Sequence, residues 1–224
     1  MVQKTVQMMN DKLSLEIIEF GNTSIKLYVP GYGYVKQKYE ESKLNAAGAH
    51  FPYWAKIWPA AIGMCNFINA HSSLITGKKV LELAAGLGLP SLLAAAYAAE
   101  VCCSDYLQDA IDVIDRSIAI NEYNNIYTQL LNWHHLPDSL QADILLMSDV
   151  NYDEEEFAVL YKVIERFIAG GTTIILSTPQ RLMAKSFIGK LMPWVAHQEE
   201  MEINVPEKTF VSIFVLRKKK KDKV

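Results

Sequence analysis

The amino-acid sequence of 224 residues predicts an α/β fold: a doubly wound, mostly parallel seven-stranded sheet that ends in an antiparallel hairpin and follows a short N-terminal β extension. From residue 52 onward, short apolar runs alternate with segments of helical spacing, which is the pattern of a parallel sheet covered on both faces. The last two apolar runs are joined by a short turn at Pro206, and strands linked so closely must pair antiparallel.

The elements are expected in a definite order along the chain. Two strands, Leu13–Phe20 and Ser24–Val29, flank a Gly21-Asn22 turn. Apolar residues at three- and four-residue spacing predict helices at Ile57–Asn69, Gly88–Ala98, Leu107–Asn121, Glu154–Ile168 and Leu182–Leu191. Short apolar runs predict strands at Lys79–Leu83, Glu100–Ser104, Ile126–Leu131, Asp143–Met147, Thr172–Leu176, Glu199–Asn204 and Thr209–Leu216. Residues 1–50 are expected as an extension or flap, 51–216 as the main domain and 217–224 as a basic tail.

Composition argues against several classes of protein. Half of the residues are apolar and 21% are charged, which argues against disorder, and no apolar run approaches the ~20 residues of a membrane span. Three cysteines (Cys65, Cys102 and Cys103) cannot form a disulfide framework, and the first residues lack a signal-peptide core, so we expect a reducing, cytoplasmic location. Outside the basic tail the chain is acidic, which makes nucleic acid an unexpected partner; we expect a monomer.

The segment Val80–Pro90 joins a strand to a helix through a glycine turn. Gly86 and Gly88 lack a Cβ and allow a ligand to approach the backbone, although a turn that only packs tightly is the alternative. Asp105 ends the next strand and could accept both hydroxyls of a ribose. Glu82 before the turn would repel a pyrophosphate and attract a cation, which favours S-adenosylmethionine over NAD as the cofactor.

Four segments resemble the seven-strand S-adenosylmethionine-dependent methyltransferases, and within them the lysine methyltransferase group called methyltransferase family 16. They are Pro52–Ala61, Val80–Pro90, Cys103–Tyr106, and Leu131–Trp133 followed by Asp143–Tyr152. One departure is Ala84, where many members have glycine.

The resemblance implies a set of cofactor contacts within these segments. It implies Trp58, Ala84, Ala85, Gly86, Asp105, Trp133 and Ser148. Glu82, Gly88 and Tyr106, from the same segments, complete the set of expected cofactor contacts. Trp133 could cover the adenine, and Trp58 could offer a π face to the cationic methionine end, although core packing is the alternative for either indole. Trp54 and Trp194 are expected in the core.

Asp149 and Tyr152 are the expected catalytic pair. Their Asp-x-x-Tyr spacing resembles that of lysine methyltransferases, and the segment lacks the two prolines typical of enzymes that act on amide or adenine nitrogens. The carboxylate would orient a lysine ammonium, and the aromatic wall would desolvate it and lower its pKa. A helix cap is the alternative for Asp149.

The sequence therefore predicts transfer of a methyl group to a lysine of a protein substrate. A small-molecule N- or O-methyltransferase and a non-catalytic adenosine-ligand binding module are the alternatives. No metal is expected, because His134 and His135 have no ligand partners nearby in the sequence and are interpreted as loop residues. Four tyrosines could line a substrate channel or pack in the flap: Tyr32, Tyr34, Tyr39 and Tyr53. The tail is interpreted as a solvated terminus, with an acidic partner or RNA as the weaker alternative.

Overall fold

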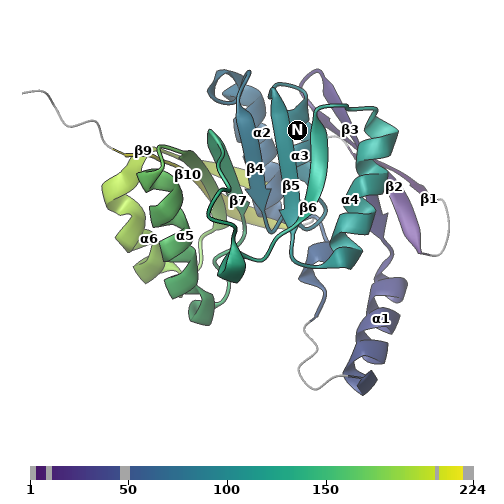
Figure 1. Cartoon of the computed structure of the whole chain (residues 1–224). Coiled ribbons are helices and arrows are strands. Elements are labelled where there is room, and N and C mark those ends of the chain that lie inside the picture. The colour runs from purple at the N-terminus through teal and green to yellow at the C-terminus, as the bar shows by residue number, and fades with distance from the viewer. Residues whose placement is uncertain (1–3, 9–11, 46–50, 205–206, 219–224) are drawn as a thin grey trace, which may run out of the picture.

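A computed structural model describes residues 4–8, 12–45, 51–204 and 207–218 of the chain (Figure 1). Its main sheet has seven strands in the order β6-β5-β4-β7-β8-β10-β9. The strands are β4 (Lys79–Leu83), β5 (Glu100–Asp105), β6 (Ile126–Leu130), β7 (Ile144–Ser148), β8 (Thr173–Pro179), β9 (Val195–Asn204) and β10 (Lys208–Leu216). β10 pairs antiparallel with β8 and with β9, and the other pairs are parallel, so the predicted fold class is confirmed.

Helices cover both faces of this sheet. One face carries α2 (Pro59–Ala70), α3 (Leu89–Ala95) and α4 (Gln108–Asn121), and the other carries α5 (Phe157–Ala169) and α6 (Lys185–Leu191). Side chains on β4 alternate between the two cores: Val80 joins the first, whereas Leu81 and Leu83 join the second. The amphipathic stripes predicted for α2, α4 and α5 face these cores, because burial of the apolar stripe drives their packing.

The N-terminal strands form a separate three-stranded antiparallel sheet of β1 (Lys4–Met8), β2 (Leu13–Phe20) and β3 (Thr23–Pro30). Apolar residues of this sheet, among them Ile25 and Leu27, are buried in the core beneath α2, α3 and α4. The outer edge of β3 is paired by side chains of α4, because Asn121 bonds both backbone groups of Lys26 and the Ser117 hydroxyl accepts from the Tyr28 amide.

Two N-terminal elements were not expected from the sequence, namely β1 and the helix α1 (Tyr32–Asn45). Helix α1 is polar on nearly all sides, so it carries no apolar period that would predict it. Straight-chain polar residues of good helix propensity build it, with a Gln37–Glu41 hydrogen bond one turn apart. It projects from the end of the molecule where the parallel strands finish (Figure 1).

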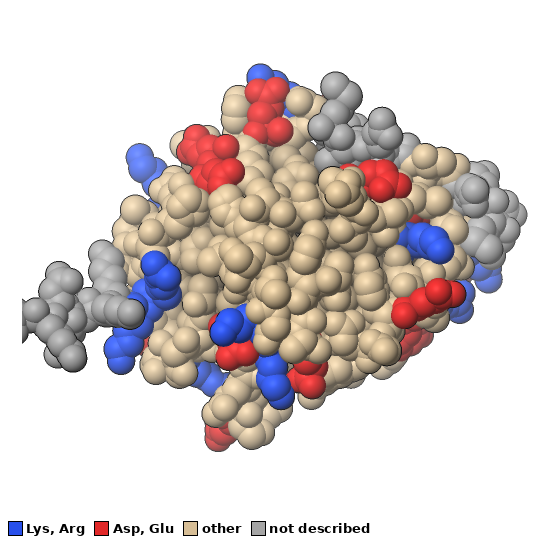
Figure 2. Space-filling model, turned by 90° about the horizontal axis from the view of Figure 1, so that it is seen from above, with Lys and Arg blue, Asp and Glu red and all other residues tan. Residues whose placement is uncertain are grey.

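No helix in the described ranges combines the length and apolarity needed to cross a bilayer. Figure 2 shows the face at the opposite end from α1, where Lys and Arg side chains are scattered among Asp and Glu around a large uncharged area. Among the residues that the structure describes, this face carries no broad basic patch of the kind that binds a phosphate backbone.

Candidate active site

A cavity of about 570 Å³ opens where β4, β5 and β7 end. The structure places ten of the twelve predicted site residues in its lining: Trp58, Ala84, Ala85, Gly86, Asp105, Tyr106, Trp133, Ser148, Asp149 and Tyr152. They converge because the carboxyl ends of parallel strands meet at one edge of the sheet, where ligands bind in open α/β folds. The other two, Glu82 and Gly88, lie outside the lining.

The glycine turn after β4 needs left-handed backbone at alternate positions. Ala84 has φ 54° and Gly86 has φ 59°. A Cβ on Gly86 would lie 3.1 Å from the Trp54 carbonyl oxygen, so this glycine lets the tryptophan-containing lead-in approach the turn. Ala84 adopts a conformation that glycine enters without steric cost, so glycine would be less strained at this position.

Gly88 serves packing rather than the cavity. It directly precedes α3 with φ 73°, and a Cβ there would lie 2.9 Å from the Cys103 Sγ and 3.3 Å from Ile114. The contacts of Gly88 therefore match the alternative interpretation of the glycine turn, in which it only allows tight packing.

The Glu82 side chain points into the core, whereas the charge argument from the sequence assumed that it faces the ligand. Its Oε2 accepts hydrogen bonds from the Ser91 amide at 2.9 Å and the Ser91 hydroxyl at 2.5 Å, so it holds the first turn of α3. Burial raises the pKa of Glu82 from 4.5 to about 8, and the two bonds from Ser91 oppose that rise. A carboxyl that is largely protonated at neutral pH and faces the core does not supply the repulsion of pyrophosphate inferred from the sequence. The sequence pattern could not reveal the direction of this side chain, because a strand that is buried on both faces shows no alternation of polar and apolar residues.

Asp105 secures the turn and still faces the cavity. Its Oδ2 accepts from the Gly86 amide at 3.0 Å and its Oδ1 from the Leu107 amide at 3.1 Å. Burial raises the pKa of Asp105, and the bonds from the backbone amides oppose that rise. Each carboxylate oxygen has two lone pairs, so each retains an acceptor position for a ligand hydroxyl.

Asp149 is held by an arginine that the sequence did not reveal. Its backbone is left-handed with φ 56°, and its amide donates to the Ser177 carbonyl at 2.9 Å. The Arg181 Nη1 lies 2.5 Å from the Asp149 Oδ1, which joins the ends of β7 and β8. The cap at the next helical turn is instead made by Asp153, whose Oδ1 accepts from the Glu155 amide at 3.0 Å. The observed contacts of Asp149 are therefore those of an ion pair and not of a helix cap.

Aromatic side chains form one wall of the cavity. The Tyr53 ring centroid lies 5.9 Å from that of Tyr152 and 6.1 Å from that of Trp58. Burial is the largest cause that raises the pKa of Tyr152 and of Tyr106, with nearby carboxylates adding to it. Both phenols thus stay protonated at neutral pH and can donate hydrogen bonds.

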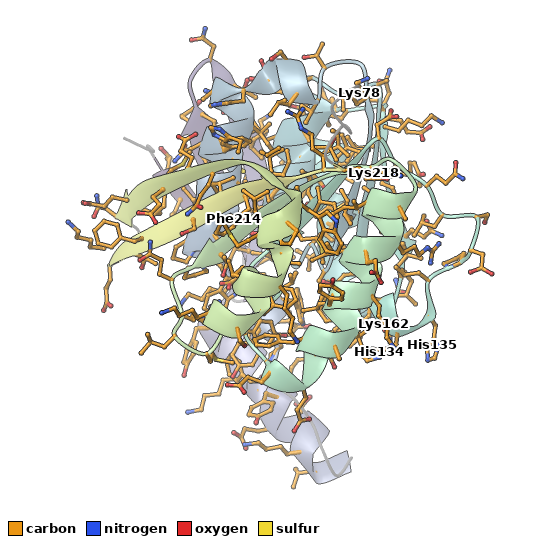
Figure 3. All side chains as sticks on the ribbon, turned by 90° about the vertical axis from the view of Figure 1, so that its left-hand side faces the viewer. Lys78, His134, His135, Lys162, Phe214 and Lys218 are labelled. Atoms are coloured by element: carbon orange, nitrogen blue, oxygen red, sulfur yellow. The ribbon has the colours of Figure 1, made fainter. Side chains whose placement is uncertain are left out.

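Glu156 and His134 complete the adjoining wall and were missed from the sequence. The Glu156 Oε2 accepts from the Trp133 indole at 2.8 Å, and the His134 Nε2 lies 3.0 Å from the same oxygen. Figure 3 shows His134 and His135 beside the start of α5, near Lys162. The signal that could have pointed to Glu156 is the run of acids directly after the Asp149 segment. Its bond fixes the orientation of the indole expected to cover an adenine.

The charge of the cavity is predominantly negative. Four carboxylates line it: Asp105, Asp149, Asp153 and Glu156. Among the lining residues that the structure describes, Lys56 is the one lysine or arginine, and its Nζ lies 4.6 Å from the Trp58 ring centroid. The indole face of Trp58 thus already contacts one cation, the Lys56 ammonium. Such a lining favours cationic ligands over phosphates. The preference for a cationic cofactor that the sequence analysis attributed to Glu82 therefore arises from these four carboxylates instead.

Of the remaining aromatic residues singled out, Tyr53 and Trp54 line the cavity, and Tyr32 lines a neighbouring cavity of about 560 Å³ under the N-terminal sheet. Trp194 packs against Tyr161 with ring centroids 5.4 Å apart, as expected for a packing residue. Tyr39, on α1, meets Phe51 edge to face.

The fold and the position of the cavity define a Rossmann-like methyltransferase fold. A 16S rRNA N2 G1207 methyltransferase from T. Thermophilus superposes with a TM-score of 0.62, covering 95% of this chain and 52% of that chain at 14% identity. A putative RNA methyltransferase from Pyrococcus horikoshii gives 0.57 over 82% and 98% of the two chains, at 20% identity. At these identities the likeness concerns the fold alone.

The chain belongs to the lysine methyltransferase family, whose model matches residues 40–193. Histone-arginine methyltransferase METTL23 of Rattus norvegicus is 34% identical over 48% of this chain and 51% of its own length. EEF1A lysine methyltransferase 3 of Mus musculus is 28% identical over 70% of this chain and 72% of its own. The chain spans about half the length of METTL23 from rat, human and mouse.

Proposed function

We propose that this protein transfers the methyl group of S-adenosylmethionine to the side-chain nitrogen of a lysine in a protein substrate. The observation that carries the proposal is the acidic cavity at the strand ends, where the Asp149 carboxylate and the Tyr53 and Tyr152 rings face one space. Membership of the lysine methyltransferase family supports the acceptor class.

The described residues fit the cofactor. The Ser148 Oγ is buried, lines the cavity and has no hydrogen-bond partner within the described ranges, so a ligand would satisfy it. Asp105 would accept the ribose hydroxyls, Trp133 would cover the adenine, and the acidic lining would accept the cationic methionine end. When bound, the cofactor supplies an electrophilic methyl group on a sulfonium.

The remaining task of the protein is to present a neutral amine. The Asp149 carboxylate would accept a hydrogen bond from the lysine nitrogen, while the adjacent Arg181 guanidinium disfavours a second positive charge. Partial burial against the tyrosines acts in the same direction, because desolvation lowers the pKa of an ammonium. Together these effects favour the deprotonated nucleophile in line with the methyl group.

Arginine is the second candidate acceptor. The 34% identity to a histone-arginine methyltransferase supports it, and Asp149 already binds a guanidinium in the form of Arg181. An arginine does not lose its proton before binding. A substrate arginine would have to displace Arg181 from the Asp149 carboxylate or share the carboxylate with it. A neutral lysine nitrogen needs only one free lone pair on that carboxylate.

A labelled-methyl experiment tests the proposal. The full chain is incubated with methyl-labelled S-adenosylmethionine and cell extract, protein and small-molecule fractions are counted separately, and methylated peptides are sequenced by mass spectrometry. We expect label on lysine. Label confined to arginine or to small molecules would refute the lysine assignment, and no label in any fraction would favour a non-catalytic binding module.

The Asp149→Asn variant separates chemistry from binding. It keeps the shape of the side chain but removes the charge that pairs with Arg181 and that would strengthen the hydrogen bond from the lysine nitrogen, so turnover should fall by at least about tenfold while cofactor affinity changes less. Asp112→Asn, the same change on the exposed side of α4, is the matched control. Full activity in Asp149→Asn would remove the catalytic role.

Calorimetry tests the choice of cofactor. We expect binding of S-adenosylmethionine and S-adenosylhomocysteine and none of NAD, because carboxylates dominate the lining. Binding of NAD alone would overturn the assignment.

We also propose a monomer located in the cytoplasm, with no nucleic-acid substrate. All three cysteines are free and buried, which supports a reducing compartment. The four carboxylates that line the cavity support a partner other than nucleic acid, because they would repel a phosphate backbone.

A further inference from the structure

Two imidazoles and a carboxylate converge beyond the end of α2, on the side of that helix away from the cavity. The Glu199 Oε2 lies 3.7 Å from the His71 Nε2 and 3.5 Å from the His197 Nε2. The ligand atoms of all three residues lie within 4.8 Å of one another. Helix α2 begins next to Trp58 and has 12 residues, which corresponds to a length of about 18 Å, so this cluster is separate from the candidate active site.

The local structure explains why the three side chains meet. His197 and Glu199 are two residues apart on β9, and alternate residues of a strand point to the same face. His71 directly follows α2, and its ring stacks on Phe67 with centroids 4.4 Å apart and planes 19° apart. The stack fixes one imidazole, whereas His197, with 49% of its side chain exposed, can adjust.

We propose that His71, His197 and Glu199 bind a divalent transition-metal ion of the zinc class. Two imidazole nitrogens and one carboxylate oxygen are ligands that zinc prefers, whereas calcium and magnesium prefer oxygen alone. Tetrahedral zinc places its ligand atoms about 3.3 Å apart. The two distances to Glu199 are close to that separation, so binding needs a small rotation of the exposed His197 side chain. Water would complete the coordination, because all three side chains are partly exposed.

The surroundings of His71 set a limit on affinity. Its Nδ1 is buried without a hydrogen-bond partner in the described part of the chain. When Nε2 binds a metal, the ring proton must reside on Nδ1, where it lacks the acceptor that usually supports a metal-bound histidine. We therefore expect binding in the micromolar range rather than the far tighter binding of closed structural zinc sites.

The ion would join α2 to β9, which is the edge strand of the main sheet. An edge strand exposes unpaired backbone groups, and a link to the neighbouring helix would hold it against the body of the protein. The expected consequence is stabilisation of the fold by the metal, since any ligand that binds the folded state alone raises its stability.

Calorimetric titration with zinc chloride tests the site. The full chain is freed of metal with a chelator, and its melting temperature is measured with and without zinc. We expect one zinc ion per chain, a higher melting temperature, and affinity at least about tenfold weaker in His197→Ala and in Glu199→Gln, corresponding to a loss of 1.4 kcal/mol or more. Both residues are partly exposed, so both variants should fold, and their melting temperatures without metal check this.

Two variants serve as matched controls. Glu200→Gln makes the same change one residue further along β9, on the opposite face, and His135→Ala removes another imidazole. Both should bind zinc like the unmodified protein. The proposal is overturned if saturable binding is missing up to about 1 mM zinc, if His197→Ala and Glu199→Gln bind normally, or if the controls weaken binding equally.

Discussion

Glu82 should make the stability of this protein fall as pH rises through neutrality. Its side chain is fully buried, and its Oε1 has no hydrogen-bond partner among the described residues. The pKa rises from 4.5 in the unfolded chain to about 8 in the folded protein because burial penalises the charged form. The perturbation we propose is Glu82→Gln, which resembles the protonated acid and does not titrate.

The sign and size of the effect follow from the two pKa values. Between pH 4.5 and about 8 the folded protein holds a proton on Glu82 that the unfolded chain has released. The stabilisation from that proton is fully present below pH 4.5 and is lost as pH rises towards 8. The slope is about 1.4 kcal/mol per pH unit, so the free energy of unfolding should fall by about 3 kcal/mol from about pH 5.5 to about pH 7.5.

Urea denaturation at three pH values within this window measures the effect. The quantity of interest is the difference in free energy of unfolding between the protein and Glu82→Gln, because other titrating groups contribute equally to both. Glu165→Gln on the exposed face of α5 is the control and should leave the pH dependence unchanged. Parallel pH profiles for the protein and Glu82→Gln would refute the reasoning.

Three other changes have predictable outcomes. Ala84→Gly removes a Cβ from backbone with φ 54° and should raise the free energy of unfolding by up to about 1 kcal/mol in urea denaturation; a loss of stability would contradict this. Asp105→Ala removes the acceptor of the Gly86 amide and the proposed ribose ligand, so calorimetry should show affinity for S-adenosylmethionine reduced by about 1.5–3 kcal/mol. Removal of residues 217–224 should cost no more than about 1 kcal/mol, because Arg217 contributes one backbone bond to Trp194; a large drop in melting temperature would show wider packing.

The sequence was sufficient to place the ends of the strands but not the partners found there. Asp105, Ser148 and Asp149 each follow an apolar run, and the parallel topology brings the ends of such runs together. Arg181 pairs with Asp149 across 32 residues, and Glu156 with Trp133 across 23, at distances no local pattern encodes. Glu82 shows the same limit, since its direction depends on which face of β4 meets α3.

Two strained residues directly follow the ends of neighbouring strands at the candidate active site. Leu83 of β4 and Met147 of β7 are paired, and the chain turns left-handed at Ala84 after one and at Asp149 after the other. Non-glycine residues in this conformation cost about 1–2 kcal/mol each and persist only where their surroundings hold them. Here the ion pair to Arg181 and the bond to the Ser177 carbonyl hold Asp149. The strain redirects both chains at the point where the cavity opens, which is why Asp149 faces the ligand space instead of continuing the strand.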